Sequence, residues 1–236
     1  GRALLEYYAI PSYHIRELWD PDVEDGSAYR PCDFRKHAVL LRLSTDGVLP
    51  VDLSAGVKYD HTGYGPGFVE YDADAWTGSV GATLRPLRGL RLDAGYALRS
   101  STARGYDEIG ESKSDSDDSD TSYEQDEYSL RARWELGRVR GVPVVLTAGG
   151  RLSRRFYQTE RSADDDPYHA GRDDTYWTLW VRSGWELSDG LTLEGFYALR
   201  TRSARSEVAE EIGMLKDYTA HRTGIRLVLR GESFLD

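Results

Sequence analysis

Apolar and polar positions alternate strictly along several stretches of this chain. From 51 to 60 the odd positions read Val, Leu, Ala, Val, Tyr, and the even positions read Asp, Ser, Gly, Lys, Asp. The same split recurs over 90–99 and 128–136. Successive side chains of a β-strand point to opposite faces. A period of two therefore predicts strands with one apolar and one polar face rather than helices.

This pattern predicts about ten strands joined by connections of two lengths. Strands are expected over 37–44, 51–60, 75–85, 90–101, 125–136, 142–155, 174–187, 191–202 and 218–230, with a further one within 3–18. Short connections (45–50, 86–89, 137–141, 188–190) contain the Gly, Pro or Asp-Gly that tight turns need. They alternate with long ones at 61–73, 102–124, 156–173 and 203–217, and the first strand is expected to lead into another long connection through Phe34. An antiparallel meander of this kind places all short turns at one end.

Composition narrows the class of protein. The chain has 236 residues and a formal net charge of −10, with 39% hydrophobic and 30% charged residues. Its 16 Tyr and 6 Trp suit strands whose two faces meet different solvents. No apolar run reaches the about 18 residues of a transmembrane helix, a single cysteine excludes a disulfide framework, and the acidic balance argues against nucleic acid as a partner. We expect one domain over 1–236, a mature form or a fragment such as the C-terminal domain of a longer protein.

Alternation alone leaves open which face is buried, because a water-soluble β-barrel would hide its apolar face inside. Aromatic residues near the strand ends of the apolar face favour a membrane, since such side chains collect at membrane–water interfaces. The candidates for this aromatic girdle are Tyr59, Trp76, Tyr96, Trp134, Trp177, Trp185 and Tyr197. Strands of about 10 to 13 residues also fit a tilted crossing of the hydrocarbon layer.

Stretches such as LRLDAGYALRS, YSLRARWELG and LTLEGFYALRTRS resemble the bacterial outer-membrane β-barrel class over nearly the whole chain. The resemblance implies a closed antiparallel up-and-down transmembrane β-barrel with short periplasmic turns and long extracellular loops. It also implies insertion by the barrel-assembly machinery, residence in the outer membrane of a Gram-negative cell envelope, and contact with outer-membrane lipid, lipopolysaccharide and other envelope proteins. Members of this class often end in an aromatic residue, whereas Phe234 stands two residues before the end of this sequence.

The polar face carries many charges that would line the lumen of such a barrel. These are Arg42, Asp52, Lys58, Arg91, Asp93, Arg99, Arg131, Arg133, Glu135, Arg151, Arg182, Glu186, Glu194, Arg200, Arg222 and Arg226. Because cations outnumber acids, the set fits a narrow, anion-favouring pore. A ten-stranded barrel is largely filled by its own side chains, however, so an ion-paired plug that stiffens the wall is the preferred interpretation.

Acidic runs in the long connections raise the question of metal binding. Asp115, Asp117, Asp118 and Asp120 alternate with or adjoin serines, and their oxygens could serve Ca²⁺. The run lacks the glycine and terminal glutamate of an EF-hand loop, so a solvated, self-repelling loop is the preferred reading. The run Asp164-Asp165-Asp166 is interpreted in the same way.

Two Asp–His combinations suggest a hydrolase at the rim, because outer-membrane proteases of the omptin type activate water with such pairs. Asp60-His61 ends one expected strand, and Asp166 lies near His169 in a long connection. Adjacent strand residues point to opposite faces, so Asp60 and His61 would diverge unless the strand has ended. We therefore expect a non-enzymatic protein without a cofactor: a membrane anchor, scaffold or subunit of an envelope assembly. The narrow pore, the omptin-like rim hydrolase and the soluble β-barrel remain alternatives.

Overall fold

The computed structural model describes residues 1–19, 29–45, 51–65, 68–113, 116, 118–159, 161–188 and 190–229. Most of them lie in strands: β1 (Arg2–Trp19), β2 (Tyr29–Ser44), β3 (Val51–Tyr64), β4 (Ala73–Leu87), β5 (Leu90–Ala103), β6 (Tyr123–Val139), β7 (Val142–Tyr157), β8 (Arg172–Ser188), β9 (Leu191–Ser206) and β10 (Tyr218–Leu229). The helical elements are the short η1 (Val69–Tyr71) and α1 (Ile212–Lys216). Among the described residues, no helix has the length and apolar character to cross a membrane.

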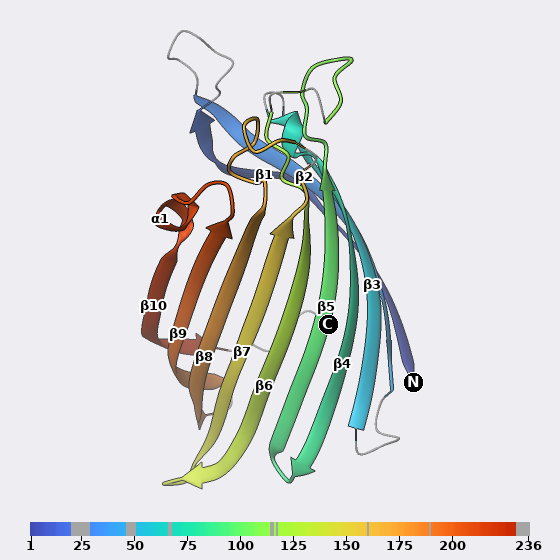
Figure 1. Ribbon diagram of the computed structural model, residues 1–236. Coiled ribbons are helices and arrows are strands. Elements are labelled where there is room, and N and C mark those ends of the chain that lie inside the picture. The colour runs from blue at the N-terminus through green and yellow to red at the C-terminus, as the bar shows by residue number, and fades with distance from the viewer. Residues whose placement is uncertain are drawn as a thin grey trace.

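The strands form one 10-stranded sheet in which each strand pairs antiparallel with the next, in the order β1 to β10. The sheet is strongly curved, with the described short turns at its lower end and the described parts of the long connections toward its upper end in Figure 1. The prediction of an all-β, ten-stranded, antiparallel up-and-down arrangement is confirmed, including the first strand within 3–18. β1 and β10 stand at the two ends of the order.

The hairpin turns show how the sequence sets the short connections. Between β6 and β7, Arg140 and Gly141 both have positive φ, of 52° and 85°. Two successive positive φ values define the type I′ turn, whose twist matches that of the flanking strands. Glycine adopts this conformation without steric cost.

Strand bounds at the loop end, where the long connections lie, were predicted too short. β2 begins at Tyr29, so Phe34 lies in a strand and not in a connection. Similarly, β3 continues to Tyr64 and β9 to Ser206. Backbone pairing continues there although polar residues occupy both faces, as in the pairing of His37 with His61. Hydrophobic alternation detects a strand only while one face remains apolar.

The registers assign every strand residue to one of two faces, because directly opposite residues of an antiparallel pair share a face. Arg99 of β5 bonds Asp60 of β3, and the Nζ of Lys58 in β3 lies 5.5 Å from the ring centre of Tyr8 in β1. Both contacts pass over an intervening strand, and curvature brings side chains two strands apart together on the side toward which the sheet curves. The face with the charged residues is therefore the concave face (Figure 1), and the apolar face is the convex face.

Exposure on these two faces is the reverse of that in a typical soluble protein. On the convex face, Leu53 is 51% exposed and Trp76 is 59% exposed. On the concave face, Asp60 and Asp174 expose 1% and 0%. Aspartate is almost never fully buried unless it is paired, and large exposed aliphatic patches are rare on monomeric soluble domains. Within the described chain, the buried apolar cluster is small: Ala204, Ala209 and Ile212, where α1 meets the end of β9.

Candidate functional site

All sixteen charged residues assigned from the sequence to the lumen share the concave face by register. They come from β2 (Arg42), β3 (Asp52, Lys58), β5 (Arg91, Asp93, Arg99), β6 (Arg131, Arg133, Glu135), β7 (Arg151), β8 (Arg182, Glu186), β9 (Glu194, Arg200) and β10 (Arg222, Arg226). Their side chains fall into two zones that differ in contacts and exposure: a loop-side zone near the long connections and a turn-side zone near the short turns.

Asp60 is the centre of the first cluster in the loop-side zone. Arg99 donates to both of its oxygens, at 2.8 and 3.0 Å, and Lys36 and Lys58 lie 2.8 and 3.2 Å away. Arg99 also donates to the hydroxyl of Tyr123 at 3.0 Å. Three cations around one buried carboxylate leave this cluster with a positive excess.

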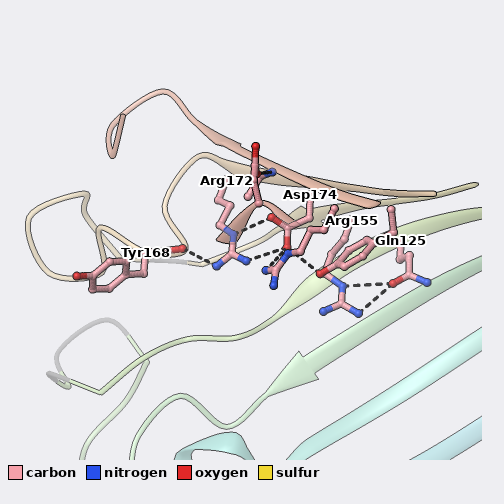
Figure 2. A network of polar contacts seen from close by, with 9 residues as sticks. Gln125, Arg155, Tyr168, Arg172 and Asp174 are labelled. Carbon is pink, nitrogen blue, oxygen red and sulfur yellow. Dashed lines mark hydrogen bonds and ion pairs between the residues drawn. The ribbon is translucent and has the colours of Figure 1, made fainter. Parts of the chain in front are cut away.

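A second cluster surrounds Asp174, as Figure 2 shows. Arg172 donates to its two oxygens at 2.9 and 2.8 Å, Arg202 donates at 2.8 Å, and the hydroxyl of Tyr176 donates at 3.0 Å. Arg172 also donates to the carbonyl oxygen of Tyr168 at 3.1 Å, which ties the strand to the connection before it. Such multiply bonded, charge-assisted contacts hold their partners in fixed positions.

Tyrosine rings separate the cations of this zone. The Arg155 guanidinium lies 4.0 Å from the ring centre of Tyr123, and that of Arg172 lies 4.5 Å from the ring centre of Tyr157. Arg155 donates to Gln125 at 3.1 and 3.2 Å (Figure 2). Aromatic faces attract cations, so the rings compensate charge where carboxylates are too few.

Most residues of the loop-side zone were missed from the sequence. Lys36, Gln125, Arg155, Arg172, Asp174 and Arg202 lie on the concave face but were not assigned to the lumen. The available signal was the alternation of side chains between the two faces of each strand. These residues continue the polar positions of each strand toward and beyond its predicted end.

The turn-side zone is more open. Arg91 donates to Asp93 at 2.8 Å and Arg226 to Glu194 at 2.6 Å, and the four side chains are 23% to 51% exposed. A hollow of about 610 Å³ lies here, lined in part by Arg91, Arg131, Arg133 and Glu135. This zone can therefore admit water and small ions.

The seven aromatic girdle candidates all lie on the convex face by register. Trp134 and Trp185 lie toward the short turns, and Trp76 and Trp177 toward the long connections. Tyr96 and Tyr197 lie nearer the middle of their strands, and Tyr59 packs against Trp76 with ring centres 4.9 Å apart.

Tyrosine hydroxyls of the convex face repeatedly meet a polar group on the next strand. Tyr59 donates to Asp74 at 2.5 Å and Tyr96 donates to Asp126 at 2.5 Å. The Tyr197 hydroxyl lies 2.9 Å from Nδ1 of His221. The partner is placed toward the loop end in each case, so these bonds mark where the convex face changes from apolar to polar.

The Asp–His combinations do not form a shared rim site. Asp60 points to the concave face, whereas His61 points to the convex face and lies 3.0 Å from Asp74. Their expected divergence follows from the continuation of β3 past both residues. Asp166 and His169 do meet, at 2.8 Å, but the second oxygen of Asp166 accepts the backbone N–H of Asp120 at 3.1 Å. This pair therefore joins two connections.

The acidic residues proposed for Ca²⁺ divide between two places. Asp118 clusters with Asp107 and Glu111, their oxygens within 4.8 Å of one another. Burial and the neighbouring Asp107 carboxylate raise the pKa of Asp118 to about 6. Asp120 lies apart from them, 3.5 Å from Lys113. Asp115 and Asp117 lie outside the described residues.

Arg161 links the long connections to one another. Its guanidinium donates to the carbonyl oxygens of Lys113 at 3.2 Å and Gly105 at 3.0 Å, and the residue is 7% exposed. Gly105 in turn donates to the carbonyl oxygen of Glu70 at 2.8 Å, before β4. Connections far apart in the sequence thus form a bonded layer at the loop end.

In comparisons with known proteins, no protein family, curated protein or solved structure matches the chain. The site must therefore be interpreted from its own chemistry: a shielded cationic network, an exposed apolar surface, and a layer of tied loops.

Proposed function

We propose that this protein is an integral outer-membrane β-barrel that acts without enzymatic activity, as an anchor or scaffold for an envelope assembly. The carrying observation is the direction of the side chains. The aliphatic and aromatic groups of the convex face are exposed, and the charges of the concave face shield one another. A convex face of this kind suits hydrocarbon, and a closed β-sheet satisfies backbone groups that lipid cannot.

An anchor is favoured over a rim hydrolase because the Asp–His residues already have structural partners. A hydrolytic pair must hold a water between or beside its members. Asp60 is occupied by Arg99, Lys36 and Lys58, and Asp166 by His169 and the backbone of Asp120. Replacing Asp166 or His169 should therefore destabilise the loop layer, and no hydrolytic activity should be lost.

The direct test of membrane residence and closure is electrophoretic migration of the detergent-extracted protein before and after heating. A closed barrel is expected to migrate faster unheated, and the purified chain is expected to stay dispersed only with detergent. Backbone amides of β1 and β10 should also exchange with deuterium as slowly as those of β5, because closure pairs both edge strands. A detergent-free, monodisperse protein with fast-exchanging edges would contradict the proposal.

A narrow, anion-favouring pore is the second candidate, because cations outnumber carboxylates on the concave face. Arg131, Arg133 and Arg182 line hollows in the turn-side zone. The loop-side clusters around Asp60 and Asp174 oppose conduction, since they join side chains of several strands. Planar-bilayer recordings separate the two. The anchor predicts no steps above the membrane baseline, whereas the pore predicts anion-selective steps that Arg131→Glu reduces.

A further inference from the structure

A hollow of about 650 Å³ lies on the loop-side part of the convex face, over β7 to β10. Arg154, Thr175, Trp177 and Arg205 line it, together with hydroxyls from Thr201 and Ser203 and the carboxylates of Asp173 and Asp217. It differs from the rest of the convex face because charged and hydroxyl groups adjoin an exposed indole here.

The registers arrange these groups in rows. Arg154, Thr175 and Ser203 lie opposite one another across β7, β8 and β9. Arg205 lies one step nearer the loops, opposite Asp173, and Trp177 lies one step nearer the turns, opposite Thr201. Strands two apart are separated by about 10 Å, so the guanidinium groups of Arg154 and Arg205 can approach one ligand above Thr175 from both sides.

The two arginines are available for such a ligand. Both are exposed, and among the described residues neither has a carboxylate within 4 Å. The Arg154 guanidinium lies 5.2 Å from the ring centre of Phe156. Over the described strand positions of the convex face, the remaining arginine is Arg35 on β2, far along the sheet order. Two arginines beside hydroxyl donors are typical of phosphate recognition.

Acidic neighbours limit which phosphate would bind. Asp173 faces Arg205 across the strand pair, and Asp126 faces Arg154 while accepting the Tyr96 hydroxyl at 2.5 Å. Asp217 accepts the backbone N–H of Ala204 at 2.6 Å. These carboxylates lower the net charge of the hollow, so a free anion gains little there. A ligand that also covers Trp177 and the leucines below it gains more.

We propose that this hollow binds the phosphate of a phosphorylated amphiphile. The phosphate would lie between Arg154 and Arg205, the polar linker against Trp177, and an acyl chain over Leu179 and Leu199, which occupy the next row toward the turns. The phosphorylated lipid part of lipopolysaccharide has this chemistry. The inference rests on the proposed membrane residence, because the acyl chain must lie along the convex face.

The test measures binding of three probes to the detergent-solubilised full chain by native mass spectrometry: lipopolysaccharide, its dephosphorylated form, and inorganic phosphate. Wild type should bind the first, and the double variant Arg154→Gln/Arg205→Gln should bind it about tenfold or more weakly. Arg35→Gln is the matched control on the same face and should bind as wild type does. The single variant Arg154→Gln should show an intermediate loss.

Each contrary result has a defined meaning. Equal binding by the double variant, equal loss in Arg35→Gln, or equal binding of dephosphorylated lipopolysaccharide would overturn the site. Inorganic phosphate that competes as strongly as the lipid would overturn the contribution of Trp177 and the leucines. Heat-modifiable migration is recorded for every variant. If the wild-type protein shows no heat-modifiable migration, membrane residence itself is rejected. If it shows heat-modifiable migration but does not bind the lipid, only this site is rejected.

Discussion

The loop-side and turn-side zones of the concave face contain the same residue types but hold them differently. At the loop side, Arg172 and Asp174 are 3% and 0% exposed, and the carboxylate has several donors. At the turn side, the side chains of Arg133 and Glu135 are 47% and 60% exposed, and their contact is longer, at 3.5 Å. The comparison teaches that composition alone does not make a rigid interior. Rigidity requires each charge to be shielded and shared.

The energetic meaning of this difference follows from desolvation. An exposed ion pair contributes about 0–1 kcal/mol, because water solvates its separated members nearly as well. Removal of one partner from a buried pair costs about 3–5 kcal/mol, since an uncompensated charge remains. The loop-side zone should therefore govern global stability, and the turn-side zone should tolerate substitution.

The largest expected effect comes from Asp174→Ala. Loss of this carboxylate leaves Arg172 and Arg202 close together without their shared acceptor, and the free energy of unfolding should fall by about 3–5 kcal/mol. Denaturant unfolding in detergent micelles, followed by tryptophan fluorescence, measures it. Asp93→Ala in the turn-side zone is the matched control. Equal losses in the two variants would remove the distinction between the zones.

A smaller effect is expected from Gly149→Val, which lies between the zones. A Cβ at Gly149 would stand 2.3 Å from the indole of Trp180, which crosses β7 on the concave face. The indole would have to move, at a cost of about 1–3 kcal/mol. The same unfolding assay applies, and Gly78→Val, where a Cβ meets no atom within 4 Å, should change stability little. Similar losses for both would argue against close packing at Trp180.

The turn-side pair of Arg226 and Glu194 should contribute little to stability. Glu194→Gln removes the negative charge that accepts the hydrogen bond of Arg226 but keeps the shape of the side chain. We therefore expect the free energy of unfolding to change by less than about 1 kcal/mol. Raising the salt concentration should erase even this difference, because exposed pairs are screened. A loss comparable to that of Asp174→Ala would mean that the turn-side zone is as rigid as the loop side.

The smallest effect is local and depends on pH. Because the pKa of Asp118 is raised from 3.8 to about 6, the folded loop favours the protonated carboxyl. Its stabilising contribution is present below about pH 4 and is lost as pH rises through about 6. Hydrogen exchange of residues 104–113, corrected for intrinsic rates, should be faster at pH 7 than at pH 5. Asp118→Asn should abolish this difference, and an unchanged difference in the variant would assign it to another group.

The sequence predicted the sheet because its signals were local. Strict alternation in 51–60 and the turn residues around Gly89 and Gly141 determine strands and hairpins without reference to the rest of the chain. The clusters around Asp60 and Asp174 were not predictable in this way. Their partners lie on other strands, such as Arg99 for Asp60, and only the register shows which polar residues meet. Likewise, Asp118 was grouped with Asp120 by sequence adjacency, while folding joins it to Asp107 and Glu111.

The single cysteine of the chain gives the protein an intrinsic reporter of assembly. Cys32 on β2 is 2% exposed, so a maleimide dye should label the denatured chain and leave the assembled form unmodified. The time course of protection from the dye would then follow folding of the sheet around Cys32 without any engineered residue.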